Sequence, residues 1–439
     1  METSLEYSAC ASLVALGVRF QQMGIWSVIA QHVHIHQKVR QHTPSDKLLD
    51  CFLNILAGGI GVVEANTRVR PDHALQCAFG RVTCAEQSTI SRTLTACTPE
   101  NVTQLRTALT EILRCHSRSG RHDYTHAWQL LDVDMTGLPA GRHGEGVTKG
   151  YFANRKNRRG RQLGRVLATR YDEIVVDRLY LGKRQLDASL VELVTTAEAV
   201  LELAENKRQN TILRMDGGGG DDKGINWVLE RGYHLLTKMK SWSRAQKLTR
   251  SVRSWTADPK VVEREVGWIE EPQVYARPTR QVGVRQRDAY GQWTYHVLVF
   301  TLTDEMLFQV GDQLPASSPS AIDVALAALY AYDRRGGGVE TQNKGDKQGL
   351  GLARRNKHAF AAQEVLVLLG QLAHDVVIWT RNELAQADER LEKYGIKRTV
   401  RDVLHIDGQI EINPAGRVQQ ITLNARHPLA AAFQNAYIR

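Results

Sequence analysis

The sequence lacks the cysteine spacing of a disulfide or zinc framework. Its six cysteines lie between Cys10 and Cys115, and no two of them form a Cys-x-x-Cys pair. Zinc sites and small disulfide-stabilised domains both depend on such recurring spacings. We therefore expect reduced, mostly buried thiols in a cytoplasmic protein.

Several motifs of catalysis and membrane insertion are also missing. The glycine run GGGGDDKG does not continue into the Gly-Lys-Ser/Thr of a phosphate-binding P-loop, and no Gly-x-Ser-x-Gly elbow of a serine hydrolase occurs. The apolar stretch 51–63 is shorter than the ~20 residues that a membrane span needs. The first residues, METSLEYSAC, lack the basic and then apolar pattern of an export signal, so we expect neither export nor a membrane partner.

What the chain does have is an excess of positive charge on an otherwise ordinary composition. Its 439 residues are 42% hydrophobic and 24% charged, which is typical of a globular protein with several structural units. Lys and Arg number 57 against 47 Asp and Glu, a net charge of +10. This balance favours a polyanionic partner such as nucleic acid.

The hydrophobic pattern predicts an α/β fold. Up to about residue 127 the apolar residues recur at helical spacing. Three short runs rich in Val, Leu, Ile and Tyr then predict successive strands, followed by a helix over 189–206, a strand TILRM, a helix and a strand HLLTKMK. This order indicates a mixed sheet rather than a strict βαβ repeat. Residues 241–319 are β-rich, helices return at 321–335 and 360–384, and the tail predicts a hairpin or a small group of strands.

Three acidic residues stand at positions where they can converge. Asp134 lies at the end of the first predicted strand, Asp216 directly follows TILRM, and Glu340 follows a late helix and a glycine run. Such a cluster binds two Mg²⁺ ions, one for the attacking oxygen and one for the leaving oxygen of a phosphodiester. Mg²⁺ favours a few carboxylates together with phosphate oxygens, and Mn²⁺ is a possible substitute.

Asp132 leaves an alternative open for the first ligand. Side chains of a strand alternate between the two faces with a period of two, so Asp132 and Asp134 point to the same side. Asp132 is therefore either a supporting partner of Asp134 or the ligand itself.

These motifs resemble a known family. DVDMT, MDGGGG and the order Tyr332, Arg335, Glu340, Lys347 are similar to the DDE transposases of bacterial insertion sequences, in the cut-and-paste group with a Tyr-Arg-Glu-Lys signature. The resemblance extends over most of the chain, through LLDCFLNILAGG, RPDHALQCAFG and EQSTISRTL near the start and HAFAAQEVLVLLGQLAHDVVIWTR near the end.

The resemblance implies an RNase H-like mixed sheet flanked by helices, interrupted by a β-rich insertion and preceded by an all-α N-terminal domain. An insertion fits the sequence, because Glu340 lies 124 residues after Asp216, too far for an uninterrupted core of this type. The expected units are a helical DNA-binding region (1–125), the first part of the core (126–240), the β-rich insertion (241–319), the second part of the core (320–385) and a β-containing tail (386–439).

By resemblance, Tyr332, Arg335 and Lys347 hold DNA phosphates near the cleaved end. The chemistry of the side chains agrees, because Arg binds phosphate in a bidentate manner and Lys supplies a mobile point charge. One departure is visible: four residues separate Arg335 from Glu340, where the usual signature has three. The interval from Glu340 to Lys347 keeps the usual six residues, and Glu340 is the best third acid.

Basic runs near the acids predict contact with DNA. Residues 149–170 contain no acid, and neither does the run SWSRAQKLTRSVRSW, which also contains tryptophans. Basic side chains neutralise phosphates and aromatic rings stack on unpaired bases. The candidate DNA-binding residues here are Arg155, Lys156, Arg158, Arg159, Arg161 and Lys238. In the family a tryptophan of the insertion can accept a flipped base, and the candidates are Trp242, Trp255, Trp268 and Trp293.

Near the N-terminus, AEQSTISRTL is typical of the second helix of a helix-turn-helix, with Gln87, Ser88, Thr89 and Arg92 facing DNA. A capped structural helix is an equally good interpretation of this short pattern.

Together these features predict a metal-dependent DNA transposase. Asp134, Asp216 and Glu340 would hold two Mg²⁺ ions for cleavage at the element's ends and strand transfer into target DNA. The expected partners are double-stranded DNA and a second copy of the chain in the DNA complex, in the bacterial cytoplasm and at the nucleoid. Two alternatives stay open: a non-catalytic DNA-binding relative, and an RNase H-like nuclease without strand transfer.

Overall fold

Capped helices build the first part of the chain. In a computed structural model, which describes residues 3–152, 155–315 and 317–437, Thr43 and Thr98 each form a capping box in front of a proline that starts a helix. The helices are α1 (Ala11–Gln22), α2 (Ile25–His32), α3 (Pro44–Leu56), α4 (Ala65–Arg68), α5 (His73–Ala78), α6 (Gln87–Ala96) and α7 (Pro99–His116).

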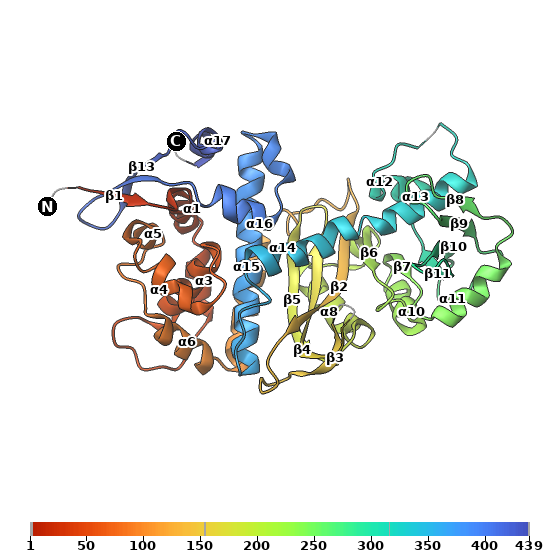
Figure 1. The fold of residues 1–439 in the computed structure, drawn as a ribbon, viewed down its shortest axis with the longest axis horizontal. Helices are drawn as coiled ribbons and strands as arrows, with labels where there is room; N and C mark the ends of the chain where they lie inside the picture. Colours follow the sequence, from red (N-terminus) through yellow and green to blue (C-terminus); the bar gives the residue numbers. More distant parts are fainter. Residues whose placement is uncertain (1–2, 153–154, 316, 438–439) are drawn as a thin grey trace.

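The sequence predicted an all-α N-terminal region, but a strand precedes these helices. β1 (Ser4–Ser8) pairs antiparallel with β12 (Gly408–Ile412), which forms a hairpin with β13 (Val418–Leu423). The predicted C-terminal hairpin is therefore present, and it joins the two ends of the described chain in one three-stranded sheet. Both termini lie at the same end of the molecule (Figure 1). The strands of this sheet and the tail helix α17 (Ala430–Tyr437) pack on α1.

The central sheet contains the three successive strands predicted from the sequence and the two later predicted strands, TILRM and HLLTKMK. Its first strands are β2 (Gln129–Pro139), β3 (Thr148–Phe152), β4 (Arg155–Ala168) and β5 (Glu173–Leu181), and after α8 (Leu186–Leu201) and α9 (Glu205–Arg208) come β6 (Thr211–Met215), α10 (Asp222–Glu230) and β7 (His234–Lys238). β2 lies between β4, which is antiparallel to it, and β6, which is parallel to it. β5 pairs with the other edge of β4, and β7 runs parallel to β6. The sheet is therefore mixed, as predicted.

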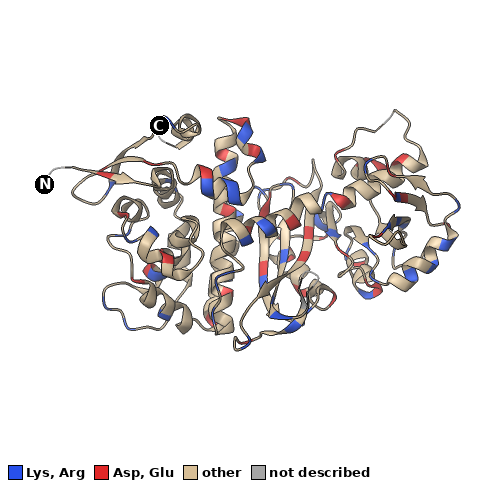
Figure 2. Ribbon diagram, in the orientation of Figure 1, with Lys and Arg blue, Asp and Glu red and all other residues tan. Residues whose placement is uncertain are grey.

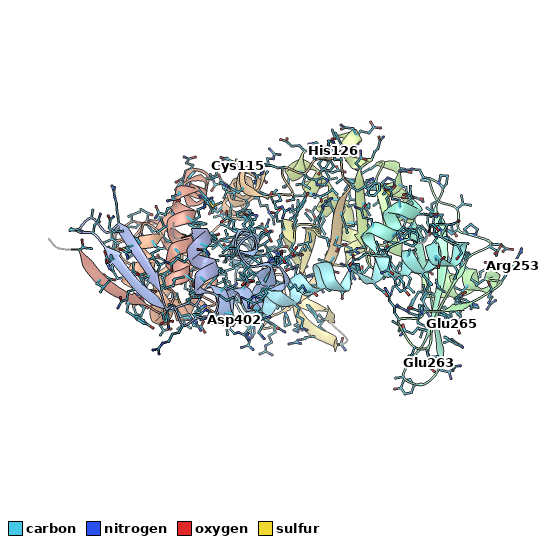
Figure 3. All side chains as sticks on the ribbon, turned by 90° about the horizontal axis from the view of Figure 1, so that it is seen from above. Cys115, His126, Arg253, Glu263, Glu265 and Asp402 are labelled. Carbon is cyan, nitrogen blue, oxygen red and sulfur yellow. The ribbon has the colours of Figure 1, made fainter. Side chains whose placement is uncertain are left out.

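The strands of the β-rich segment continue this same sheet. After α11 (Trp242–Leu248) and η2 (Thr249–Ser251), they are β8 (Thr256–Ala257), β9 (Arg264–Trp268), β10 (Arg280–Arg287) and β11 (Trp293–Phe300). β11 pairs antiparallel with β7, and β10, β9 and β8 follow in order. The pairing covers the edge of β7 that would otherwise expose unpaired backbone groups. Arg253, Glu263 and Glu265 lie at the end of the molecule opposite the N-terminal helices (Figure 3).

A late run of helix crosses the sheet after α12 (Asp304–Val310). It comprises α13 (Ala321–Asp333), a π-helical turn η3 (Gly336–Glu340) and α14 (Thr341–Gly349). Inside the turn, Gly338 has the non-helical angles φ −89° and ψ −115°. A π-turn accommodates one residue more than an α-turn. It therefore explains how the chain fits four residues between Arg335 and Glu340.

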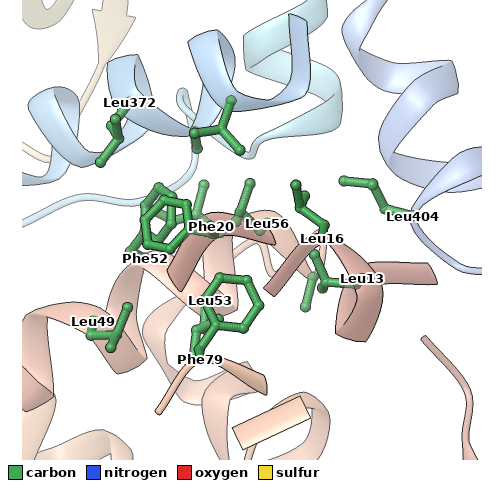
Figure 4. Close-up of a cluster of buried hydrophobic side chains, with 14 of the residues drawn as sticks. Leu13, Leu16, Phe20, Leu49, Phe52, Leu53, Leu56, Phe79, Leu372 and Leu404 are labelled. Atoms are coloured by element: carbon green, nitrogen blue, oxygen red, sulfur yellow. The ribbon is translucent and has the colours of Figure 1, made fainter. Parts of the chain in front are cut away.

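The long helix α15 (Phe360–Ala385) stands between the N-terminal helices and the central sheet (Figure 1). Its Leu372 joins a buried cluster with Leu16, Phe20 and Phe52 of the N-terminal helices (Figure 4). After α15, the chain passes through η4 (Glu389–Lys393), α16 (Ile396–Arg398) and η5 (Thr399–Val403) to the tail.

Within the described ranges, α15 is long and apolar enough by length and composition to cross a membrane, and α1 and α2, bent by 60°, meet that test only as a pair. Of the apolar window of α15, 94% is buried inside the protein, which is the environment of a core helix.

Candidate active site

Asp134 lies on the central strand β2 and is almost fully buried. Its side chain has two partners from the late helical run: Arg335 Nη2 donates to Oδ1 at 2.6 Å, and Asn343 Nδ2 donates to Oδ2 at 2.8 Å. The residue is 7% exposed. The carboxylate therefore faces the π-turn and α14, as the prediction of convergence with Glu340 requires.

Asp132, the alternative first ligand, is engaged elsewhere. Its two oxygens accept from Arg214 Nε at 2.6 Å and Nη2 at 2.8 Å, and both side chains are buried. Arg214 Nη1 also donates to the carbonyl oxygen of Ala331 on α13 at 2.6 Å. This buried pair ties β2 and β6 to α13 and leaves Asp134 as the carboxylate that faces the site.

Glu340 and Asp216 complete the predicted set from two other elements. Glu340 ends the π-turn, its side chain is 53% exposed, and it forms an ion pair with Arg335. Asp216 directly follows β6, and its Oδ1 accepts from the backbone N–H of Gly218 at 2.8 Å. The Arg335 guanidinium thus joins two of the three predicted acids directly.

Electrostatic coupling places all three acids in one neighbourhood. Burial raises the pKa of Asp134 to about 6; Arg335 opposes this effect, while Asp216 and Glu340 add to it. The same two acids also act on Lys238, whose pKa is lowered by burial, and on Tyr332, whose pKa is raised by burial. Arg335 has its pKa lowered by burial, but the surrounding carboxylates outweigh that effect and raise it. The predicted acids and the predicted residues Tyr332, Arg335 and Lys238 therefore form one cluster.

A small polar cavity opens beside this cluster. Its volume is about 310 Å³, and it is lined by Asp134, Thr136, Glu340, Asn343, Lys344, Lys347 and Gln348. Lys347, predicted as a phosphate ligand, donates to the Thr136 hydroxyl, and its pKa is lowered by burial. Asp216 is not among the lining residues. Among the described residues, no three His, Cys, Asp or Glu side chains are already arranged to hold a metal ion, because Arg335 lies between the acids.

A buried ion network, which no sequence pattern predicted, holds α14 in place. Asp346 on α14 accepts from Arg165 of β4 at 2.6 Å and from His374 of α15 at 2.7 Å. Arg165 also forms a bidentate pair with Asp177 of β5. His374 is fully buried and bonded at both ring nitrogens, to Asp346 and to the carbonyl oxygen of Asp172. The network fixes the helix that carries Asn343 and Lys347.

The family assignment follows from the whole chain. The sequence profile of the family described as "Transposase DDE domain group 1" matches residues 8–439. The chain belongs to this DDE transposase family. Such a transposase has, in general, phosphodiester hydrolysis and transesterification as its chemistry, and DDE domains use divalent metal ions.

Among solved structures, the transposase chain is similar to one described as "Cryo-EM structure of piggyBac transposase synaptic complex with hairpin DNA (SNHP)". The TM-score is 0.42 at 13% sequence identity, over 92% of this chain and 82% of that chain. No curated protein matches the chain.

The basic run of the transposase divides into exposed and buried members. Arg158 and Arg159 on the β3–β4 hairpin are exposed, as a DNA contact requires. Arg161 is 1% exposed, and its donors bind the carbonyl oxygens of Glu145, Lys357 and His358, so its prediction as a DNA-binding residue is wrong. These hydrogen bonds give Arg161 a structural role, because they connect β4 to the loop before α15. The side chains of Arg155 and Lys156 lie outside the described part of the structure.

Arg92 lies on the outer surface of α6. It is exposed, and its Nη2 donates to Ser88 Oγ one turn earlier at 3.3 Å. Residues Gln87–Ala96 are helical as predicted. Blue segments in Figure 2 mark Lys and Arg on this helix region, on the β3–β4 hairpin and on α11.

Two of the four candidate tryptophans flank an arginine. The Arg285 guanidinium carbon lies 4.5 Å from the ring centre of Trp255 and 4.6 Å from that of Trp293. Trp268 instead donates from Nε1 to the Ala321 carbonyl and packs on Phe300, so it has a structural role. Trp242 is 58% exposed at the start of α11.

Proposed function

We propose that this transposase cuts DNA at the ends of a bacterial insertion sequence and joins the freed ends to target DNA by a cut-and-paste route. The observation that carries the proposal is the pairing of Asp134 on β2 and Glu340 at the end of the π-turn with the single guanidinium of Arg335. Asp216, which follows β6, also acts on the pKa of that guanidinium.

The donor chemistry of the site fits Mg²⁺. Carboxylates are the ligands that Mg²⁺ prefers, and Asp134, Asp216 and Glu340 would hold it. Asn343, whose amide oxygen Oδ1 is buried without a hydrogen-bond partner, is one of the residues that line the cavity. When bound, two such ions activate the attacking oxygen and stabilise the leaving oxygen of a phosphodiester. Mn²⁺ is expected to substitute, because it accepts the same oxygen ligands.

The basic side chains around the acids would position the DNA. Arg335 can bind a phosphate with two parallel hydrogen bonds once the backbone of DNA approaches, as the Tyr-Arg-Glu-Lys signature implies. Asp134 acts electrostatically on Lys347, and Asp216 and Glu340 act on Lys238, so both lysines would supply positive charge at the reacting phosphate. Tyr332 adds a hydroxyl donor next to Arg335. Together these donors favour a phosphate held beside the cavity, where a bound cation would offset the repulsion between the phosphate and the carboxylates.

The strand order supports an RNase H-like core. β5, β4, β2, β6 and β7 are neighbours in that order, with the first three antiparallel and the last three parallel. Asp134 then lies on β2, and Asp216 directly follows the adjacent strand β6. We assign the two parts of the core to residues 126–240 and 320–385 and the insertion between them to residues 241–319.

A wider surface would bind the DNA away from the cut. Arg158, Arg159 and Arg92 are exposed on two separate elements, and the Trp255–Arg285–Trp293 group offers aromatic faces for an unpaired base. We expect a homodimer to hold two DNA ends together, in the cytoplasm at the nucleoid.

A joining assay tests the function. A labelled oligonucleotide carrying the inverted repeat that flanks the reading frame is incubated with the protein, Mg²⁺ and a supercoiled target plasmid. The proposal predicts both cleaved ends and label joined to the plasmid. Cleavage without joining would favour a nuclease without strand transfer, and DNA binding without cleavage would favour a non-catalytic relative.

A further inference from the structure

Asn343 has a buried polar atom that nothing in the described structure satisfies. The residue is 4% exposed, and its Oδ1 is shielded from solvent without a hydrogen-bond partner. Buried polar atoms in folded proteins are nearly always bonded, because losing water without a replacement costs stability. Several other buried side-chain atoms also have no partner, but Asn343 lines a cavity together with Asp134 and Glu340, where a ligand can supply the missing contact.

The orientation of the amide follows from its partner. Asn343 places one end of its side-chain amide 2.8 Å from Oδ2 of Asp134. A carboxylate accepts hydrogen bonds, so the NH₂ group of the amide must face it. The carbonyl oxygen is then necessarily the end that lies free.

The residue that carries the free oxygen lines the cavity beside two of the predicted acids. Asn343 comes three residues after Glu340, so the two share one face of the helical run. Both line the cavity of about 310 Å³ together with Asp134. Arg335 supplies the positive charge between Asp134 and Glu340 in this structure.

We propose that Asn343 is an additional ligand of the divalent cation, contributing its Oδ1 beside the carboxylates of Asp134 and Glu340. This inference rests on the proposed function. Mg²⁺ and Mn²⁺ both take oxygen ligands, and the amide carbonyl adds one without adding charge. The same side chain also orients Asp134 through its NH₂ group.

The two roles of Asn343 predict opposite effects of one substitution. If Oδ1 is a ligand, Asn343→Asp replaces a neutral oxygen donor by a carboxylate and tightens the binding of the cation. If the residue only orients Asp134, the same substitution removes the hydrogen-bond donor and sets two carboxylates against each other, and binding weakens.

The experiment titrates the full-length protein, without DNA, with Mn²⁺ and follows unbound Mn²⁺ by electron paramagnetic resonance. The variants are N343D, N343A, the cavity-lining control Q348A and the carboxylate variant D134N. Each is also combined with the substitution R335Q, which removes the guanidinium that pairs with Asp134 and Glu340. We expect Q348A to bind like wild type, N343A to bind about tenfold more weakly and N343D about tenfold more tightly.

Weaker binding by N343D, or unchanged binding by N343A, would overturn the inference. If N343A does not fold, as judged by circular dichroism, N343S takes its place, because its short side chain cannot reach the cation position. If neither wild type nor R335Q binds Mn²⁺, or if D134N binds as tightly as wild type, the proposed function itself fails. Loss of binding in D134N with no response at Asn343 refutes only the ligand role.

Discussion

At the scale of single residues, Arg335 balances the charge of the site. Its guanidinium is buried and contacts Asp134 and Glu340, while Asp216 lies close enough to act on its pKa. Removing one partner of a buried ion pair leaves an uncompensated charge and costs about 3–5 kcal/mol. The exposure of Glu340 reduces this cost on its side of the pair.

Replacing Arg335 by Gln should therefore destabilise the protein when metal is removed. We expect a melting temperature several degrees below that of wild type in EDTA, and recovery on adding Mg²⁺, because the cation binds the acids that the guanidinium no longer neutralises. Thermal denaturation by circular dichroism checks this. R334Q is the matched control, because Arg334 and its partner Asp312 are largely exposed. An R335Q variant as stable as wild type in EDTA would contradict this role.

The sequence predicted the acids and Arg335, but not the other side chains that hold them. Asp134 and Asp216 could be predicted because strand ends recur at recognisable positions, and Glu340 because of its place in the resemblance. Asn343, Arg214 and Asp346 act through residues far away in the chain, on strands and helices whose packing no local pattern encodes. For the same reason Arg161 could be counted among exposed basic residues although the fold buries it.

At the scale of elements, the π-turn sets the direction of α14 relative to α13. Gly338 lies at its non-helical position, and a Cβ there would lie 2.7 Å from Oδ2 of Asp132. A Cβ on Gly337 would meet nothing within 4 Å. Gly338 thus has a steric reason to be glycine, because a Cβ would clash with Asp132, whereas Gly337 has no such reason.

Substituting these glycines by Ala should separate their roles. Gly338→Ala should lower stability by about 1–3 kcal/mol, because the buried Asp132–Arg214 pair has to shift. Gly337→Ala should change stability by no more than about 0.5 kcal/mol. Urea denaturation of both variants measures the difference. Equal effects of the two substitutions would show that the close approach at Gly338 does not matter.

The network that anchors α14 should also respond to pH. Burial alone lowers the pKa of His374, but Asp346 outweighs burial and raises it. Both ring nitrogens face acceptors, Asp346 and the carbonyl oxygen of Asp172, so the imidazole is held in its protonated form. A raised pKa in the folded state gives stability that is complete below the unfolded value of about 6.5 and is lost as the pH rises through the folded value.

His374→Gln should thus lower the melting temperature most near pH 6 and progressively less toward pH 9. Melting curves of wild type and H374Q across this range provide the measurement, with H126Q as a control, because His126 is exposed. A difference that stays constant with pH would show that protonation of His374 contributes nothing.

The sequence predicted the helices and strands themselves better than it predicted which of them pack or pair together. The strands of 241–319 follow from alternating apolar residues, yet the pairing of β11 with β7, which makes them part of the central sheet, depends on hydrogen bonds between distant segments. The strand β1 was missed because it is short and its partner lies at the other end of the chain.

At the scale of the whole molecule, exposed positive charge should govern DNA affinity. Arg158 and Arg159 on the β3–β4 hairpin are exposed, and each lost phosphate contact reduces both affinity and its dependence on salt. The double variant R158E/R159E should bind end DNA at least about tenfold more weakly in fluorescence anisotropy at moderate salt. The control is R426E, because Arg426 is also exposed, lies in the C-terminal tail and changes charge by the same amount as each of the two hairpin substitutions. Equal losses in both proteins would indicate only a general charge effect.

The central claim is that Asp134, Asp216 and Glu340 act together as one metal-dependent centre for cutting DNA. The most direct measurement is the single-turnover rate of Mg²⁺-dependent strand cleavage at a DNA end for wild type, D134N, D216N and E340Q, with DNA affinity measured in parallel. We predict that each substitution lowers the rate by at least about a thousandfold while end binding stays within a few-fold of wild type. Cleavage at the wild-type rate by any one of the three variants would contradict the account.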